Sequence, residues 1–464
     1  MAPRIYVGRF DPRFPGVSIR ATGDSDVHSF RHHDRSRSAP VEVFTGLGDD
    51  AVISDVSRQT VLDHELRHFR DSLLFPFGAA TTRSRIHASY NGFLAAMTLV
   101  RMRGDADVLP VPLQTWLRMP APERDAFLSD EAAFAGNQLR PPPLPVIPGD
   151  DDLSDLAGAE IRAESDEELL IGSCRTALAD YRMLEDLWRS PHEDGEQLVS
   201  PAVDIWETAG LLCQLAAIAR YAGEPVMQRF VDWVVRRGPH PYRRGMQVLA
   251  VCLEQLAWPA TLRNQLALAT WAQMGRYETE RSASSPGRRL VALVSAAARG
   301  ARWSEGSAFA DLVHAWDEVA GVDSVAGLHA ATVRFGAFCR RTRMTSLLPT
   351  ELFTSLADAR EQMLAAFLDD PDAYVDPFAY LTDDDRYPLP CVGMEHPTGA
   401  LGSDWSDVTP PTWAPAVSYD AAMSLASIAL LSDAVFLPGE KSLQRNGRVA
   451  IASALDLRAV RIIR

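Results

Sequence analysis

The sequence predicts a mainly α-helical protein with a small N-terminal β-sheet, an α+β class, and three observations support this prediction. The first 55 residues hold short β-type runs separated by Gly, Pro and Asp. From about residue 57 to residue 369, apolar residues recur at helical spacing. Hydrophobic residues make up 47% of the 464 residues and charged residues 23%, which is typical of a globular chain with a buried core.

Four short runs of β-type residues precede the first helix. Each is bounded by residues that favour turns, so we expect the runs to form a small sheet ahead of that helix. The runs are Ile5–Val7, Val17–Ile19, Val41–Phe44 and Ala51–Ile53.

The first predicted helix runs from Arg58 to Leu74. Pro76 and Gly78 follow it, and both residue types end helices. A second helix is predicted from Thr81 to Met102, after a hairpin turn centred near Phe77. These two helices should therefore run back along one another.

Composition divides the chain into four segments. Residues 1–140 hold the small sheet, the first two helices and a third helical region, and residues 141–165 form a Pro-rich and acidic linker or strap. Residues 166–370 are helical. Residues 371–464 are predicted to be a Pro-, Gly- and Asp-rich loop or lid, followed by a final helix and short C-terminal strands.

Charge and cysteine usage exclude some classes of function. The net charge is -15, so the surface repels phosphate backbones, and no nucleic-acid partner is expected. The five cysteines are widely spaced and form no CxxC pair, which indicates reduced, buried thiols in a cytoplasmic protein. Neither a signal-peptide core nor an apolar run of transmembrane length is evident, so no membrane partner is expected either.

One motif carries recognisable chemistry. His64 and His68 are four residues apart on the first predicted helix, so both imidazoles leave the same face and can reach one metal ion. Glu65 lies beside them, where its carboxylate can take a proton from a water bound to the metal. The non-functional alternative is a helix with two surface histidines that bind no metal.

The HExxH pattern at residues 64–68, on a helix that follows a small sheet, resembles the zincin metallopeptidases. The resemblance covers about residues 40–100 only. It implies a zinc ion held by His64 and His68, with Glu65 as the general base. Tyr90, one turn beyond His87 on the second predicted helix, could donate a hydrogen bond to a developing oxyanion; the alternative is a core tyrosine.

Two residues are candidates for the third ligand. His87, on the second helix, would lie opposite His68 across the predicted hairpin; the gluzincin branch of the zincins carries a Glu ligand at about this place. Glu207 lies in a helix that is apolar nearly all round, where a carboxylate is costly unless it meets a cation. The alternative for Glu207 is a salt bridge to an arginine. Asp71 is about 10 Å along the helix from His64, and we expect it to orient His68 instead.

These residues predict a metal-dependent hydrolase of peptidase type that acts on a peptide or small molecule. The motif also resembles HExxH enzymes of peptide natural-product clusters, some of which are oxygenases that use Fe(II) and 2-oxoglutarate. In that alternative, Arg67, Arg83 or Arg85 would bind the oxoacid carboxylate. A second alternative is a helical interaction scaffold whose histidines are incidental.

Overall fold

A computed structural model describes most of the helical chain and parts of both terminal regions. The described residues are 8–11, 16–20, 48–103, 108–120, 122–123, 165–188, 202–275, 285–341, 350–382, 386–399, 402–409, 431–436 and 459–462. The predicted strands at 5–7 and 41–44 and most of the predicted strap at 141–165 lie outside these ranges.

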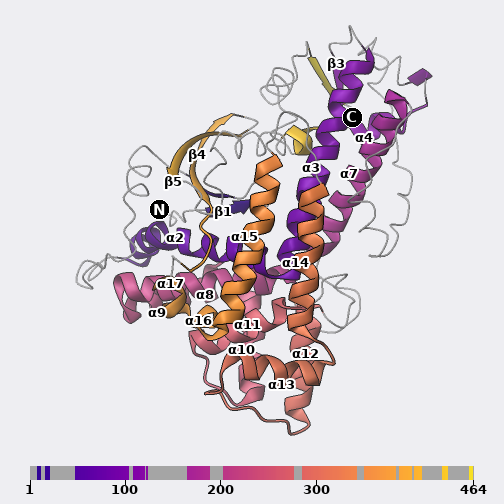
Figure 1. Cartoon of the computed structure of the whole chain (residues 1–464). Helices are drawn as coiled ribbons and strands as arrows, with labels where there is room; N and C mark the ends of the chain where they lie inside the picture. The colour runs from indigo at the N-terminus through magenta and orange to yellow at the C-terminus, as the bar shows by residue number, and fades with distance from the viewer. Residues whose placement is uncertain are drawn as a thin grey trace.

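The chain is mainly α-helical, as the sequence predicts (Figure 1). Helices α8 to α13 gather in the lower part of Figure 1, and α3 and α7 rise together from them. The helices are α2 (Asp49–Leu74), α3 (Pro76–Arg103), α4 (Leu113–Leu117), α7 (Asp166–Trp188), α8 (Ala202–Ala222), α9 (Glu224–Arg237), α10 (His240–Leu256), α11 (Leu262–Gln273), α12 (Pro286–Ala298), α13 (Phe309–Ala320), α14 (Ser324–Arg341), α15 (Thr350–Asp369), α16 (Pro371–Val375) and α17 (Pro377–Thr382).

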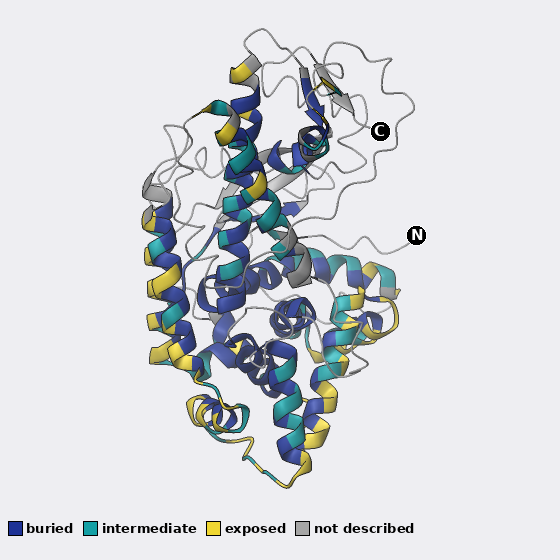
Figure 2. Cartoon of the chain, turned by 90° about the vertical axis from the view of Figure 1, so that its right-hand side faces the viewer, coloured by how far each residue is buried: buried dark blue, intermediate teal, exposed yellow. Residues whose placement is uncertain are grey.

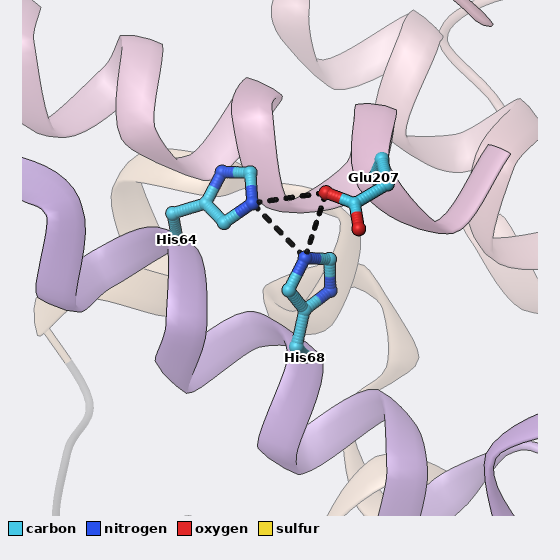
Figure 3. A group of neighbouring side chains, drawn as sticks. All are labelled: His64, His68 and Glu207. Atoms are coloured by element: carbon cyan, nitrogen blue, oxygen red, sulfur yellow. Dashed lines mark hydrogen bonds and ion pairs between the residues drawn. The ribbon is translucent and has the colours of Figure 1, made fainter. Parts of the chain in front are cut away.

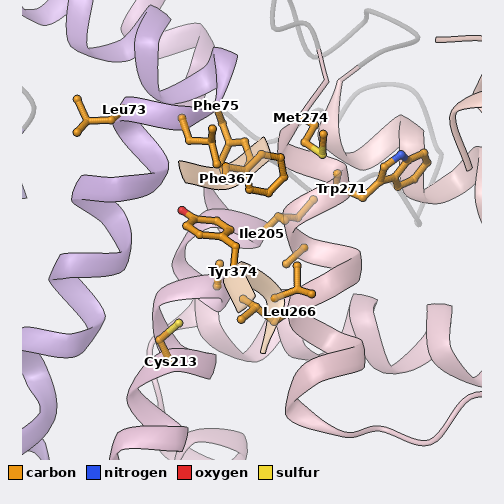
Figure 4. Packing of buried hydrophobic residues seen from close by; sticks show 14 of the residues in the cluster. Leu73, Phe75, Ile205, Cys213, Leu266, Trp271, Met274, Phe367 and Tyr374 are labelled. Carbon is orange, nitrogen blue, oxygen red and sulfur yellow. The ribbon is translucent and has the colours of Figure 1, made fainter. Parts of the chain in front are cut away.

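Helix α8 lies at the centre of the core. It packs against α2, α9, α10 and α11, and nearly all its residues are buried (Figure 2). Among the described residues, α8 is the one helix long and apolar enough to cross a membrane, yet 83% of its apolar window is buried inside the protein. Its apolar character is therefore explained by the core around it, where Ile205 and Cys213 pack with Leu266 and Tyr374 (Figure 4).

Helix α2 begins nine residues before its predicted start. Residues 51–53 were expected to form a strand, and this prediction is wrong, because they belong to the first turns of α2. Val52, Ile53 and Val56 fall on one helical face and pack against apolar residues of α8 and α9. Tertiary packing on a helical period thus overrides the β preference of Val and Ile.

A sharp corner joins α2 to α3, and the predicted hairpin at Phe77 is wrong. Phe75 alone separates the helices and is extended (φ -87°, ψ 150°), as expected for a residue before proline. The backbones approach so closely here that a Cβ on Gly78 would lie 2.2 Å from Ser72 Cα. Helix α3 therefore turns away from α2 and packs along α7 (Figure 1).

A four-stranded sheet lies beside α2 and combines two strands from residues 8–20 with two strands from residues 391–409. Its order is β1-β2-β4-β5; β2 and β4 pair in parallel, and the other two pairs are antiparallel. The first part of segment 371–464, predicted to be a loop or lid, therefore contains the two strands β4 and β5, besides α16 and α17. A second, two-stranded sheet pairs β3 with β6 in parallel. The strands are β1 (Gly8–Asp11), β2 (Gly16–Arg20), β3 (Val108–Val111), β4 (Cys391–Gly399), β5 (Gly402–Thr409) and β6 (Ala459–Ile462).

Candidate metal centre

Two imidazoles of α2 face one point between α2 and α8. His64 and His68 are one helical turn apart, and their Nε2 atoms are 3.0 Å apart (Figure 3). Both side chains are buried. Their Nδ1 atoms have no hydrogen-bond partner among the described residues, so the Nε2 atoms are the nitrogens that converge.

Glu207 of α8 completes the group. Its Oε2 lies 3.5 Å from His64 Nε2 and 3.4 Å from His68 Nε2, and these three ligand atoms all lie within 4.8 Å of one another (Figure 3). In a tetrahedral site with bonds of about 2.0–2.2 Å, two ligand atoms are about 3.3–3.6 Å apart. The two nitrogen-to-oxygen distances fall in that range. Three acceptor atoms this close repel one another unless a cation or a proton lies between them.

A glycine allows the two helices to approach at this point. A Cβ on Gly210 would lie 3.0 Å from Cε1 and Nε2 of His64 and 3.0 Å from Cε1 of His68. Gly210 is about one turn beyond Glu207 on the same face of α8, so it leaves room for the imidazoles. Gly210 thus lets α2 and α8 approach closely at the proposed ligands.

Two aromatic residues frame the group. The Trp206 ring lies 4.6 Å from the His68 ring, and Trp206 immediately precedes Glu207. Tyr242, from the start of α10, places its hydroxyl 3.5 Å from His64 Nε2 and its ring 5.5 Å from the His64 ring. Sequence reasoning did not find Tyr242, because nothing local in the sequence links α10 to the motif.

Charges within the group favour an ionised Glu207. Burial raises the pKa of the Glu207 carboxyl, but the two imidazoles together lower it by more, so its net pKa lies well below the usual range. Burial, followed by the carboxylates of Glu207 and Glu65, raises the pKa of Tyr242 well above 10. At neutral pH the site therefore holds a carboxylate ligand and a neutral tyrosine hydroxyl.

Glu65 is buried beside the histidines and contacts the sheet. Its Oε2 accepts a hydrogen bond of 2.7 Å from the main-chain N–H of Phe10 in β1. Only 6% of its surface is exposed. The carboxylate predicted to act as general base is thus held by a group that lies 55 positions earlier in the chain.

Polar contacts also fix Arg67 and Asp71 of α2. Arg67 donates to the carbonyl of Tyr374 and to Thr270 Oγ1, and its Nε lies 2.9 Å from Asp71 Oδ1. The Tyr374 hydroxyl donates to the same Asp71 oxygen at 2.6 Å. Asp71 therefore binds Arg67 and Tyr374, and the expected contact with His68 is not among its hydrogen bonds and ion pairs. Its Oδ1 is occupied by Arg67 and by the Tyr374 hydroxyl of α16 instead, about two helical turns from His64.

The other sequence candidates lie on α3. His87 Nδ1 is 2.6 Å from Asp180 Oδ2 of α7, so the structure pairs His87 with that carboxylate and does not place it in the group of three. Its position follows from the corner at Phe75, which directs α3 away from α2. Tyr90 is half-buried and packs against the main apolar core. Between the two third-ligand candidates, Glu207 is the one that lies with His64 and His68.

Comparison with known proteins adds no relative: the chain matches no protein-family model, no curated protein and no solved structure.

Proposed function

We propose that the protein is a metal-dependent hydrolase of peptidase type, with zinc held by His64, His68 and Glu207. The observation that carries this proposal is the convergence of three ligand atoms at distances of 3.0–3.5 Å, with Glu65 next to them in the sequence. Two imidazoles and one carboxylate are a common ligand set of catalytic zinc. The HExxH motif at residues 64–68 resembles that of the zincins, which is in keeping with this proposal.

Each residue has a distinct role in this proposal. A bound divalent cation would supply Lewis acidity, which polarises an amide carbonyl and lowers the pKa of a water molecule. Glu65 would accept the proton of that water and pass it to the departing amine. Tyr242, neutral at physiological pH, would donate a hydrogen bond to the carbonyl oxygen as negative charge develops there. This assigns to Tyr242 the role that the sequence suggested for Tyr90.

Of the three proposed ligands, Glu207 is the one whose side chain is most exposed to solvent. The Glu207 side chain is 25% exposed, whereas those of His64 and His68 are 4% and 5% exposed. A substrate would therefore approach past Glu207, and a chain segment fits such an approach better than a folded domain. We propose a peptide or small-molecule substrate and a cytoplasmic location, in keeping with four free, buried cysteines, Cys174, Cys213, Cys252 and Cys339.

Metal analysis tests the site. Protein purified without added metal should contain about one equivalent of zinc, and His64→Ala or His68→Ala should lose it while the helical circular dichroism spectrum is retained. His87→Ala is the matched control and should keep its zinc, because His87 pairs with Asp180. Full zinc occupancy in both His64→Ala and His68→Ala would exclude this site.

A second measurement tests the reaction. Wild-type protein should hydrolyse fluorescein-labelled casein, and Glu65→Gln should keep zinc but lose about 10²–10⁴-fold of the turnover, as is typical when a general base is removed. Near-normal turnover in Glu65→Gln would exclude the peptidase mechanism.

An iron-dependent oxygenase is the second candidate, because the same ligand set binds Fe(II). In an oxygenase, Glu65 would have only a structural role, with which its hydrogen bond from the Phe10 N–H is also compatible. Arg67 is engaged with Tyr374, Thr270 and Asp71, so binding of 2-oxoglutarate would fall to another arginine. Iron in the purified protein, together with binding of 2-oxoglutarate, would favour this candidate. Absence of any metal would favour the scaffold.

A further inference from the structure

Strand β1 forms one edge of the four-stranded sheet. Phe10 lies opposite Val17 of β2 in an antiparallel ladder. In such a ladder, residues alternate between those whose N–H points toward the partner strand and those whose N–H points away from it. The Phe10 N–H donates to Glu65 Oε2, so it points away from β2 and toward α2. The free side of the sheet edge is thus used to bind the motif glutamate.

The Phe10 side chain fixes the same strand to both ligand-bearing helices. Its ring lies 6.0 Å from Phe69 on α2 and 6.3 Å from Trp206 on α8, edge-on in both cases. Phe69 follows His68, and Trp206 precedes Glu207. One residue of β1 therefore touches the immediate neighbours of two proposed ligands and binds Glu65 through its main chain.

We propose that β1 is an element of the active site, in which the Phe10 N–H helps to position the Glu65 carboxylate. This inference rests on the proposed function for its catalytic part only. A glutamate side chain has three rotatable bonds, and a hydrogen bond to an ionised acceptor at 2.7 Å is of the short, strong kind that restricts them. The orientation of a reacting group strongly affects the reaction rate, because a misplacement of about 1 Å can lower the rate by about 100-fold.

Amide hydrogen exchange tests the contact without any enzymatic assay. In the whole protein, exchange at the Phe10 amide should be slow, and Glu65→Ala should accelerate it by about 10- to 100-fold, the range expected for a hydrogen bond to a charged group. Glu65→Gln is the matched control, because the Gln oxygen still accepts a hydrogen bond, and it should retain most of the protection. Equal exchange at Phe10 in wild type and Glu65→Ala would overturn the proposal.

A pair of substitutions tests the catalytic part. Phe10→Pro and Phe10→Ala both remove the ring, but only proline also removes the N–H, and an edge strand tolerates proline where the N–H points away from the sheet. Against labelled casein, Phe10→Pro should have a kcat about 10- to 100-fold lower than Phe10→Ala, with KM within about 2-fold and zinc content unchanged. In a Glu65→Gln background the two substitutions should give the same kcat, because the charge to be oriented is gone.

The two experiments separate the failure of this inference from failure of the proposed function. Equal kcat values for Phe10→Pro and Phe10→Ala, in protein that binds zinc and cleaves casein, would overturn the positioning role. If wild type cleaves no casein, the peptidase assignment fails, whereas the exchange experiment still decides whether β1 binds Glu65. If Phe10→Pro does not fold, the same exchange experiment decides the question, because it needs no proline variant.

Discussion

Gly210→Ala adds one methyl group to α8 directly at the proposed metal site. The new Cβ would lie 3.0 Å from Cε1 and Nε2 of His64 and from Cε1 of His68. Carbon atoms normally approach to about 3.5–4.0 Å, so the imidazoles must move by about 0.5 Å or more. Metal sites tolerate deviations of about 0.2 Å in ligand distance. We therefore expect the zinc affinity to fall by about 10- to 100-fold, comparable to the loss of a residue that orients a ligand.

The stability of the metal-free protein should change much less. Replacing glycine by alanine within a helix stabilises it by about 0.5–1 kcal/mol, whereas overpacking a core costs about 1–3 kcal/mol. The net effect of Gly210→Ala should therefore lie between neutrality and about 2 kcal/mol of destabilisation. A large loss of zinc affinity with a small loss of apoprotein stability would distinguish a defect at the site from general unfolding.

Competition with a chromophoric chelator measures the zinc affinity, and chemical denaturation of the apoprotein measures the free energy of unfolding. Gly327→Ala in α14 is the matched control, because the nearest atom to its new Cβ would be Met274 O at an ordinary 3.7 Å. This variant should keep wild-type zinc affinity and lose no stability. Wild-type zinc affinity in Gly210→Ala would refute the reasoning, since the methyl group cannot be accommodated without moving the imidazoles.

Three further substitutions test other parts of the molecule. Glu207→Gln should weaken zinc binding by more than about 100-fold, whereas His87→Gln should leave it unchanged; equal effects in a chelator competition would contradict the choice of third ligand. Arg360 is 1% exposed and donates hydrogen bonds to three main-chain carbonyls in the last turn of α2. Arg360→Met should therefore lower the free energy of unfolding in urea by about 3 kcal/mol or more. The control Arg340→Met, at an exposed position, should lower it by less than about 0.5 kcal/mol. Gly78→Ala should destabilise the protein by about 2–3 kcal/mol, because the new Cβ would lie 2.2 Å from the α2 backbone at Ser72. An unchanged melting temperature would contradict the close approach of α2 and α3 at this corner.

The local part of the site could be predicted from the sequence, because its geometry is set by helix periodicity alone. His64 and His68 share a face of any helix that contains them, and the structure has both in α2. Glu207 could be predicted by a different argument, because an ionisable side chain in an apolar helix needs a cation beside it. Tyr242 and Phe10 carry no such signal, because their roles depend on how α10 and β1 pack against α2.

The errors in the predicted fold have the same origin. Residues 51–53 have β-type side chains but lie in α2, where an apolar face of α8 and α9 is available to them. Strands β4 and β5 occupy a segment with many turn-forming residues, and their pairing with β2 and with each other supplies the stability that local propensity lacks. The placement of His87 depended on the angle of one corner, at Phe75, which a count of residues does not provide.

The parallel pairing of β2 with β4 has a consequence for the order of folding. Gly16 pairs with Cys391, so the two paired strands are far apart in the sequence. Arg67 likewise donates a hydrogen bond to Tyr374, 307 positions away. Contacts this distant in sequence form late and slowly, because a long loop must be closed first. A ribosome must therefore have synthesised the chain through β4 before β2 gains its second neighbour and the sheet that carries β1 is complete. On the proposed function, the histidines of α2 would be present early in the nascent chain, whereas the complete sheet that supports β1 and its contact with Glu65 would form only after β4 has been synthesised.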